Sequence, residues 1–245
     1  FNHFEPTKEK WAINGTAGMG KSVLLAYAAC VFCTDHTIEV DALGNRSLKP
    51  FMADSKGIPP LEDRRIVLYS LKEKQKRIVE YYWRYLIEIF QELDKGGVLR
   101  VQRPEIQLWD TEEEISANVI LIDESHDLSQ MGQEKIADWI KGDSGQRYLV
   151  IACDRHQKLR LIDDKAQERM ISGLDFGLCT KKLKRVYRNP FSVYAAALAL
   201  MFRWFAPKGP KVIPNSKQLY ESFGFDVKRR DLKSGLGCEF EMVED

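Results

Sequence analysis

A glycine-rich stretch carries the clearest chemistry in this sequence. It runs Gly15, Thr16, Ala17, Gly18, Met19, Gly20, Lys21, Ser22 and fits the pattern G-x-x-x-x-G-K-[ST]. Glycines let backbone N–H groups curve around phosphate oxygens, and the N-terminus of a following helix favours anions. Lys21 is expected to reach the β- and γ-phosphates of ATP, and the Ser22 hydroxyl is expected to bind Mg²⁺. The whole stretch is therefore predicted to hold the nucleotide.

Two acidic residues follow the apolar run Val119–Ile122. A site of this kind needs a carboxylate at the end of a neighbouring strand to hold Mg²⁺, and Asp123 is placed for that role. Glu124, beside it, could polarise the attacking water as a general base. An acidic pair after a strand is often only the start of a helix, but the upstream glycine-rich stretch favours the catalytic interpretation.

The elements around these residues predict an α/β domain. Continuous apolar runs of strand length indicate strands that are buried on both faces, as in a parallel sheet, and helical patterns alternate with them. The expected fold is a parallel sheet with helices on both faces. The predicted strands are Trp11–Asn14, Ile66–Ser70, Val119–Ile122 and Tyr148–Ala152, and the predicted helices are Ser22–Phe32, Lys72–Leu93 and Gln133–Lys141.

Two further expectations concern the long central helix and the segment before it. Spacings of four and three along the helix predict one packed face made of Ile78, Tyr82, Tyr85, Ile89 and Leu93. Glycines and prolines between about 34 and 62 predict an irregular insertion.

The pattern of apolar and polar residues changes after residue 189. Residues 1–189 are predicted to form one ATP-binding domain, and residues 190–245 are predicted to begin a second, incomplete domain with an apolar helix at Ser192–Phe205. The chain does not start with Met, so we interpret it as a piece of a longer protein whose remainder completes the second domain.

Five segments, taken in order, resemble the motifs of superfamily 1 helicases of the UvrD/Rep-like group. The first is the glycine-rich stretch, and the second is the strand Ile66–Ser70 with the helix that follows it. The third, from Asp123 to Leu128, is similar to the family's Asp-Glu-x-Gln-Asp motif. The segment from Ile151 to Gln157 resembles Gly-Asp-x-x-Gln, and the segment from Leu183 to Asn189 resembles Leu-x-x-Asn-Tyr-Arg-Ser. The resemblance covers about residues 11–200. It implies that residues 1–189 are a RecA-like motor domain and that residues 190–245 begin a second one.

The resemblance implies roles for individual residues. Gln157 would sense the γ-phosphate, Tyr187 would stack on adenine, and Arg188 would act as an arginine finger. Contacts to single-stranded nucleic acid are implied near Ser70, Lys72 and Lys74.

The sequence departs from the family pattern at two positions. His126 stands where the family has Gln, and Cys153 stands where it has Gly. The family's adenine-reading Gln and its last two motifs are not found.

Composition sets limits on the class of protein. Hydrophobic residues make up 44% and charged residues 30% of 245 residues, which is typical of a globular intracellular protein. No apolar run reaches the length of a membrane span and no signal peptide is visible, so a cytoplasmic location without membrane contact is expected. The net charge of +1 neither supports nor excludes nucleic acid as a partner. Cys30 and Cys33 lack further zinc ligands nearby, which favours two buried thiols.

The sequence therefore predicts an ATP- and Mg²⁺-dependent motor domain that moves on single-stranded DNA or RNA. Two alternatives stay open: a P-loop phosphotransferase, and a non-hydrolysing nucleotide switch or interaction module in a larger defence or repair protein. The Asp123-Glu124 pair and the Gln157 segment favour hydrolysis by water over transfer to an acceptor. The polarity of movement, the organism and the oligomeric state do not follow from the sequence.

Overall fold

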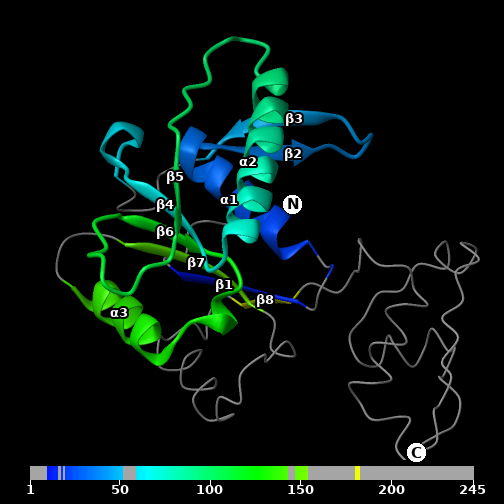
Figure 1. Cartoon of the computed structure of the whole chain (residues 1–245). Coiled ribbons are helices and arrows are strands. Elements are labelled where there is room, and N and C mark those ends of the chain that lie inside the picture. Colours follow the sequence, from blue (N-terminus) through cyan, green and yellow to red (C-terminus); the bar gives the residue numbers. More distant parts are fainter. Residues whose placement is uncertain are drawn as a thin grey trace, which may run out of the picture. The chain divides into compact units, whose positions relative to one another are not determined.

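A computed structural model describes residues 10–15, 18, 20–51, 59–142, 147–153 and 180–182 of the chain (Figure 1). The chain divides into two compact units, residues 1–16 with 21–183, and residues 17–20 with 184–245. Apart from the backbone of Gly18 and Gly20, everything below belongs to the first unit. The predicted boundary at 189/190 and the predicted second domain lie outside the described residues and remain predictions.

A parallel sheet forms the centre of the first unit. Its six strands lie in the order β5-β4-β6-β7-β1-β8, and every neighbouring pair is parallel. The predicted α/β class with a parallel sheet is therefore confirmed, and two strands, β5 and β8, were not predicted. The strands are β1 (Lys10–Asn14), β4 (Ile66–Ser70), β5 (Glu105–Leu108), β6 (Val119–Ile122), β7 (Tyr148–Cys153) and β8 (Thr180–Lys182).

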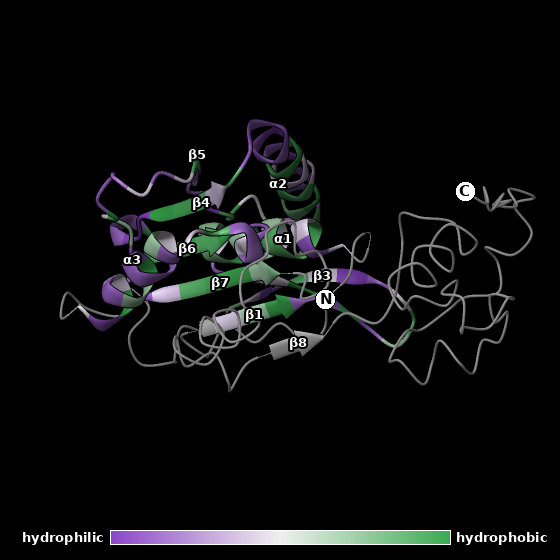
Figure 2. Ribbon diagram, turned by 60° about the horizontal axis from the view of Figure 1, so that its bottom comes forward, coloured by the Kyte–Doolittle hydropathy of each residue, from purple (hydrophilic) through white to green (hydrophobic). Residues whose placement is uncertain are grey.

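The strands are apolar throughout because both faces of the sheet are covered. In β6, Val119 and Leu121 belong to one hydrophobic core, whereas Ile120 and Ile122 belong to the other. This alternation is the period of two expected for a strand, with each face of the sheet turned towards its own core. Figure 2 shows β4, β6 and β7 coloured as hydrophobic through the middle of the molecule.

Helices cover both faces, as predicted. Helices α1 (Lys21–Thr34) and α2 (Glu73–Leu93) contribute to the first core, and α3 (Gln130–Lys141) contributes Ile136 and Trp139 to the second. Residues 25–34 of α1 are all buried, since α1 packs against the sheet on one side and α2 on another. A helix in that position must be apolar all round. Both thiols of Cys30 and Cys33 are buried in this helix.

The predicted packed face of α2 is wrong in part. Tyr85 is 55% exposed and Ile78 is 37% exposed, whereas Tyr82 and Ile89 are only partly buried against the core. The helix carries two adjoining apolar stripes, and the core selects the one without tyrosines, because a phenolic hydroxyl is more easily left in water than buried. The buried residues are Val79, Trp83, Leu86, Ile87 and Phe90.

The predicted irregular insertion at about 34–62 contains ordered structure. Strands β2 (His36–Val40) and β3 (Arg46–Pro50) form an antiparallel hairpin, so the irregular interpretation is wrong for this part. Asp41 fixes the turn, because its carboxylate accepts hydrogen bonds from the backbone N–H groups of Leu43 and Asn45, each at 2.8 Å. Gly44 has a φ of 87°, which a residue with a Cβ rarely adopts. A single 3-10 turn, η1 (Leu61–Asp63), follows.

A buried arginine joins the end of α1 to the segment before β4. The Arg64 side chain is 1% exposed, and Nη1 donates to the Phe32 carbonyl at 2.7 Å and to the Asp35 carboxylate at 2.6 Å. Its Nη2 donates to the Pro59 carbonyl at 2.7 Å. A buried guanidinium is tolerated only when its hydrogen bonds are satisfied, and here three residues from two segments supply the acceptors.

The substitution Arg64→Met is expected to lower the free energy of unfolding by about 3–5 kcal/mol, because removing one partner leaves Asp35 and two carbonyls without their donor. Unfolding by urea would measure the loss. Arg77→Met is the matched control, since Arg77 forms a solvent-exposed pair with Glu73 within α2 and should change stability by no more than about 0.5 kcal/mol. Equal losses for the two variants would contradict a structural role for Arg64.

Within the described ranges, every helix is either too short or too polar to span a bilayer.

Candidate nucleotide site

The glycine-rich stretch connects the end of β1 to the start of α1, as predicted. The Gly15 N–H donates to the carbonyl of Cys153 at 3.3 Å, which ties the start of the loop to β7. Gly18 and Gly20 have φ values of 81° and 85°. Both lie in the left-handed region, where a side chain would be strained, so the two glycines are required by the backbone itself. The predicted residues Thr16, Ala17 and Met19 lie outside the described residues.

Ser22 and Asp123 are in contact, although β1, which precedes the loop leading to Ser22, and β6, which precedes Asp123, are not neighbours in the sheet. The Ser22 hydroxyl donates to Oδ2 of Asp123 at 2.8 Å. Strand β7 lies between β1 and β6, so Ser22 reaches Asp123 from the first turn of α1, which lies over the sheet. Asp123 directly follows β6 and is 2% exposed. The structure thus brings together the two residues that the sequence predicted as magnesium ligands.

The charge of Asp123 is costly to maintain in this environment. Burial, and then the neighbouring Glu124 carboxylate, raise the pKa of Asp123 to about 6. The Ser22 hydroxyl, the Glu124 N–H and the positive charge of Lys21 act in the opposite direction. A carboxylate under these conditions is stabilised by any further cation placed beside it.

The donor set fits Mg²⁺. The hydroxyl oxygen of Ser22 and the carboxylate of Asp123 are hard oxygen donors that already converge on one point. The described residues hold no cluster of three or more His, Cys, Asp or Glu side chains suited to a metal. A protein site with few ligands is typical of Mg²⁺, which keeps several waters and binds substrate phosphates as well.

Glu124 has an unusual backbone conformation. Its φ is 53° and its ψ is 39°, in the left-handed region, and its N–H donates to Oδ1 of Asp123 at 3.1 Å. A non-glycine residue held there costs on the order of 1–3 kcal/mol and is found preferentially at functional sites. The two adjacent side chains differ in exposure: Asp123 is buried, whereas Glu124 is partly open to solvent.

A chain of polar contacts leaves Glu124 along the 3-10 turn η2 (Ser125–Asp127). Nε2 of His126 lies 3.3 Å from Oε2 of Glu124 and 3.9 Å from Oδ1 of Asp127. The other oxygen of Asp127, Oδ2, accepts from Nζ of Lys72 at 3.1 Å. The sequence did not predict these contacts.

The Ser70 side chain is buried in this structure. Ser70 is the last residue of β4 and is 0% exposed, and among the described residues its hydroxyl has no hydrogen-bond partner. Its carbonyl accepts from the Trp109 N–H at 2.9 Å, which continues the β4–β5 pairing beyond the strand. Lys72 and Lys74, by contrast, are both exposed. The nucleic-acid contacts expected near these three residues remain predictions, and of the three it is the two lysines that lie at the surface.

The remaining site residues lie outside the described residues: Gln157, Tyr187 and Arg188. Cys153 is described and is buried, with its thiol against Oδ1 of Asn14. Cys153 stands where the motif that this segment resembles has Gly, so it places a side chain against Asn14, the residue just before the glycine-rich stretch. Apart from the cysteine itself, nothing in the sequence indicated this contact.

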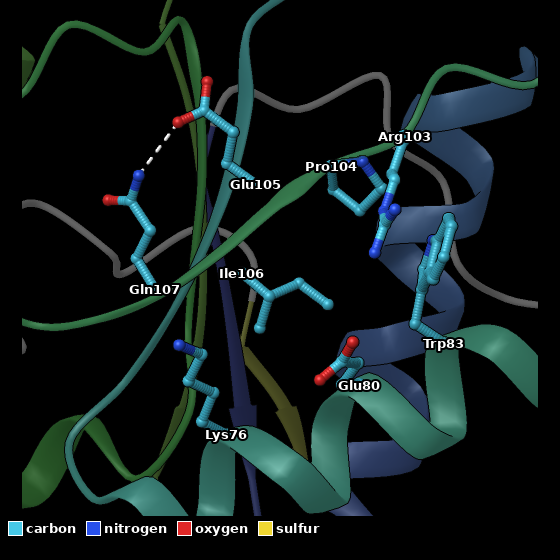
Figure 3. A pocket seen from close by; sticks show the side chains of 8 residues that line it. All are labelled: Lys76, Glu80, Trp83, Arg103, Pro104, Glu105, Ile106 and Gln107. Carbon is cyan, nitrogen blue, oxygen red and sulfur yellow. Dashed lines mark hydrogen bonds between the residues drawn. The ribbon is translucent and has the colours of Figure 1, made fainter.

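A separate cavity of about 510 Å³ lies between α2 and β5 (Figure 3). Lys76, Glu80 and Trp83 line it from the helix, and Glu105 and Gln107 line it from the strand. The Glu105 carboxylate already accepts hydrogen bonds from Gln107 at 2.8 Å and from Arg65 at 2.8 Å. None of the residues of the candidate nucleotide site lines this cavity, so it is a distinct feature of the sheet edge.

Comparisons with known proteins give limited information. No family model and no curated protein matches the sequence. Among solved structures, arterivirus nonstructural protein 10 (helicase), in complex with DNA, is 14% identical with a TM-score of 0.44, and the match covers 86% of this chain and 45% of that chain. The large terminase of bacteriophage HK97 is 11% identical with a TM-score of 0.46, and the match covers 89% of this chain and 43% of that chain. This chain spans less than half the length of either protein, and similarities of this size assign it to no family.

Proposed function

We propose that this chain is the ATP-binding motor domain of a helicase or translocase that couples ATP hydrolysis to movement on single-stranded nucleic acid. The observation that carries the proposal is the hydrogen bond between Ser22 and Asp123 across the intervening strand β7. It joins the glycine-rich loop to the acidic pair, so nucleotide, metal and general base would share one place at the carboxyl ends of the strands.

The protein's own groups would act as follows. The Lys21 ammonium and the first N–H groups of α1 would bind the phosphates. Ser22 and Asp123 would hold Mg²⁺, which when bound neutralises charge on the β- and γ-phosphates. Glu124, which has a left-handed backbone and is less buried than Asp123, would accept a proton from the attacking water.

Three further roles remain proposals from the family resemblance. Gln157 would sense the γ-phosphate, Tyr187 would stack on adenine, and Arg188 would stabilise charge on the transferring phosphoryl group. The second motor domain, begun by residues 190–245, would close the cleft over the nucleotide.

The decisive experiment is an ATPase assay on the full-length protein with and without single-stranded DNA or RNA. Hydrolysis that a single strand stimulates supports the motor. Transfer of the γ-phosphate to an acceptor in place of water would favour a phosphotransferase, and tight MgATP binding without turnover would favour a nucleotide switch. Either of these results would overturn the proposal.

Binding of single strands should depend on the two exposed lysines at the start of α2. Reversing both charges, in the double variant Lys72→Glu and Lys74→Glu, is expected to weaken binding and to make the slope of log K against log salt shallower by about 1.4, since each phosphate contact contributes about 0.7. Fluorescence anisotropy at several salt concentrations would measure both effects.

The control for this double variant is Lys49→Glu on the exposed β2–β3 hairpin, where a lysine pairs with Glu39 at 3.6 Å. It should leave binding and the salt slope unchanged. Unchanged binding in the double variant would show that the start of α2 is only a solvated helix face.

A further inference from the structure

A continuous path of polar contacts leads from the exposed start of α2 to the candidate general base. Lys72 is 55% exposed and pairs with Asp127, which is 16% exposed. Asp127 in turn faces His126, whose side chain is 3% exposed and lies against Glu124. The path thus begins at a lysine that solvent and ligands can reach and ends at the carboxylate next to the magnesium ligand.

His126 is the branch point of this path. Its Nε2 lies 3.3 Å from Glu124 Oε2 and 3.9 Å from Asp127 Oδ1. A ring nitrogen carries at most one hydrogen, so Nε2 can donate fully to only one of the two carboxylates. In this structure Glu124 is the nearer acceptor, and Asp127 has Lys72 as its cation. Any event that removes Lys72 from Asp127 makes Asp127 the stronger competitor for the imidazole N–H.

We propose that Lys72, Asp127 and His126 form a relay that restrains Glu124 until a nucleic-acid phosphate binds Lys72. A phosphate draws the Lys72 ammonium away from Asp127. The freed Asp127 carboxylate then takes the His126 N–H, and Glu124 is released to accept a proton from water. The inference rests on the proposed function and names the regulation of the same site, with His126 and Asp127 as positioning residues.

Asp127 couples the two contacts of the relay. Oδ2 of Asp127 faces Lys72 and Oδ1 faces His126. Loss of the lysine at one oxygen therefore leaves more negative charge to attract the imidazole N–H at the other. The 3-10 turn η2 places residues 124, 126 and 127 within one turn of backbone. The motion required is a small shift of one imidazole between two oxygens, with no rearrangement of the sheet.

The test compares ATPase rates of full-length variants with and without a single-stranded oligonucleotide. Lys72→Met removes the cation permanently, so the rate without oligonucleotide is expected to rise about 5-fold or more and further stimulation should nearly vanish. Asp127→Asn removes the acceptor that captures His126, so the oligonucleotide should still bind but should stimulate less than about 2-fold. Both variants should lose stimulation, but only Lys72→Met should raise the unstimulated rate, and this gain of activity is not expected when a merely structural contact is broken.

The matched control is Lys49→Met, which removes a lysine from another exposed ion pair, with Glu39, far from the path. It should keep wild-type rates with and without oligonucleotide. Because His126 is buried, His126→Gln is used in place of a truncation. Its amide can still donate, so it should retain part of the stimulation, and in its background Lys72→Met should change the unstimulated rate less than in the wild type.

The outcomes separate the relay from the proposed function. If Lys72→Met binds the oligonucleotide more weakly but keeps the wild-type unstimulated rate, Lys72 is only a phosphate contact, and the relay is overturned while the motor stands. If wild-type protein shows no ATPase activity that an oligonucleotide stimulates, the proposed function falls and the relay falls with it.

Discussion

The substitution Glu124→Gln is expected to lower kcat for ATP hydrolysis by about 10²–10⁴-fold while leaving the affinity for MgATP nearly unchanged. A general base acts in the transition state, so its loss appears in kcat and spares ground-state binding. Glutamine keeps the shape of the side chain and the backbone N–H that donates to Asp123, so the magnesium ligand should stay in place. Steady-state kinetics on the full-length protein, with calorimetry for binding, would measure both quantities.

Glu134→Gln on α3 is the matched control, because Glu134 is an exposed carboxylate that accepts a hydrogen bond from Gln130 on the same helix. It should keep the wild-type kcat. A Glu124→Gln enzyme that turns over normally but binds ATP much more weakly would assign Glu124 to the ground-state site and leave the base to be found elsewhere.

The sequence predicts the buried centre of this fold well and its margins poorly. Strands β4 and β6 have the predicted bounds, because a central parallel strand must be apolar on both faces and so appears as an unbroken run. Edge strand β5 was missed, since Glu105–Leu108 alternates polar and apolar residues over four positions, too few for a clear pattern. The hairpin β2–β3 was missed for a similar reason: its strands have five residues each, and Gly44 and Pro50 within it are typical of turns and irregular segments.

The candidate site divides in the same way. Lys21, Ser22, Asp123 and Glu124 could be predicted as one site because phosphate and metal chemistry demands particular residue types at fixed spacing, and the structure brings Ser22 and Asp123 together. The Lys72–Asp127 pair joins residues 55 positions apart, and its existence depends on how the start of α2 meets the turn after β6. No local pattern encodes that meeting. The buried Ser70 shows another limit of the sequence, because a motif places it at the strand end without telling which side its hydroxyl faces.

Nucleotide binding itself should depend most on Lys21. This residue opens α1, is 5% exposed, and lies close enough to Asp123 for its charge to lower the pKa of that carboxyl. Lys21→Ala is expected to weaken MgATP binding by about 10²-fold or more, since the triphosphate loses a buried, charged donor whose removal typically costs about 2–5 kcal/mol. Titration calorimetry with MgATP would measure the loss.

Two separate effects should contribute to this loss. The phosphates lose a direct contact, and Asp123 loses a cation that opposes the raising of its pKa by burial. Asp123 should therefore be protonated over a wider pH range in Lys21→Ala, so the affinity for Mg²⁺ should suffer along with that for ATP. Raising the pH restores the carboxylate but not the ammonium, so part of the lost affinity should return at higher pH in the variant, with a smaller gain in the wild type.

The fold should survive the change, because alanine is the most favourable residue for a helix and Lys21 stands at the end of α1 away from the Arg64 contacts. Circular dichroism and the unfolding midpoint would confirm this. Lys141→Ala, at the exposed end of α3, is the matched control and should bind MgATP as the wild type does. Wild-type affinity in a folded Lys21→Ala protein would remove the glycine-rich loop from the nucleotide site, and the contact between Ser22 and Asp123 would then need a purely structural explanation.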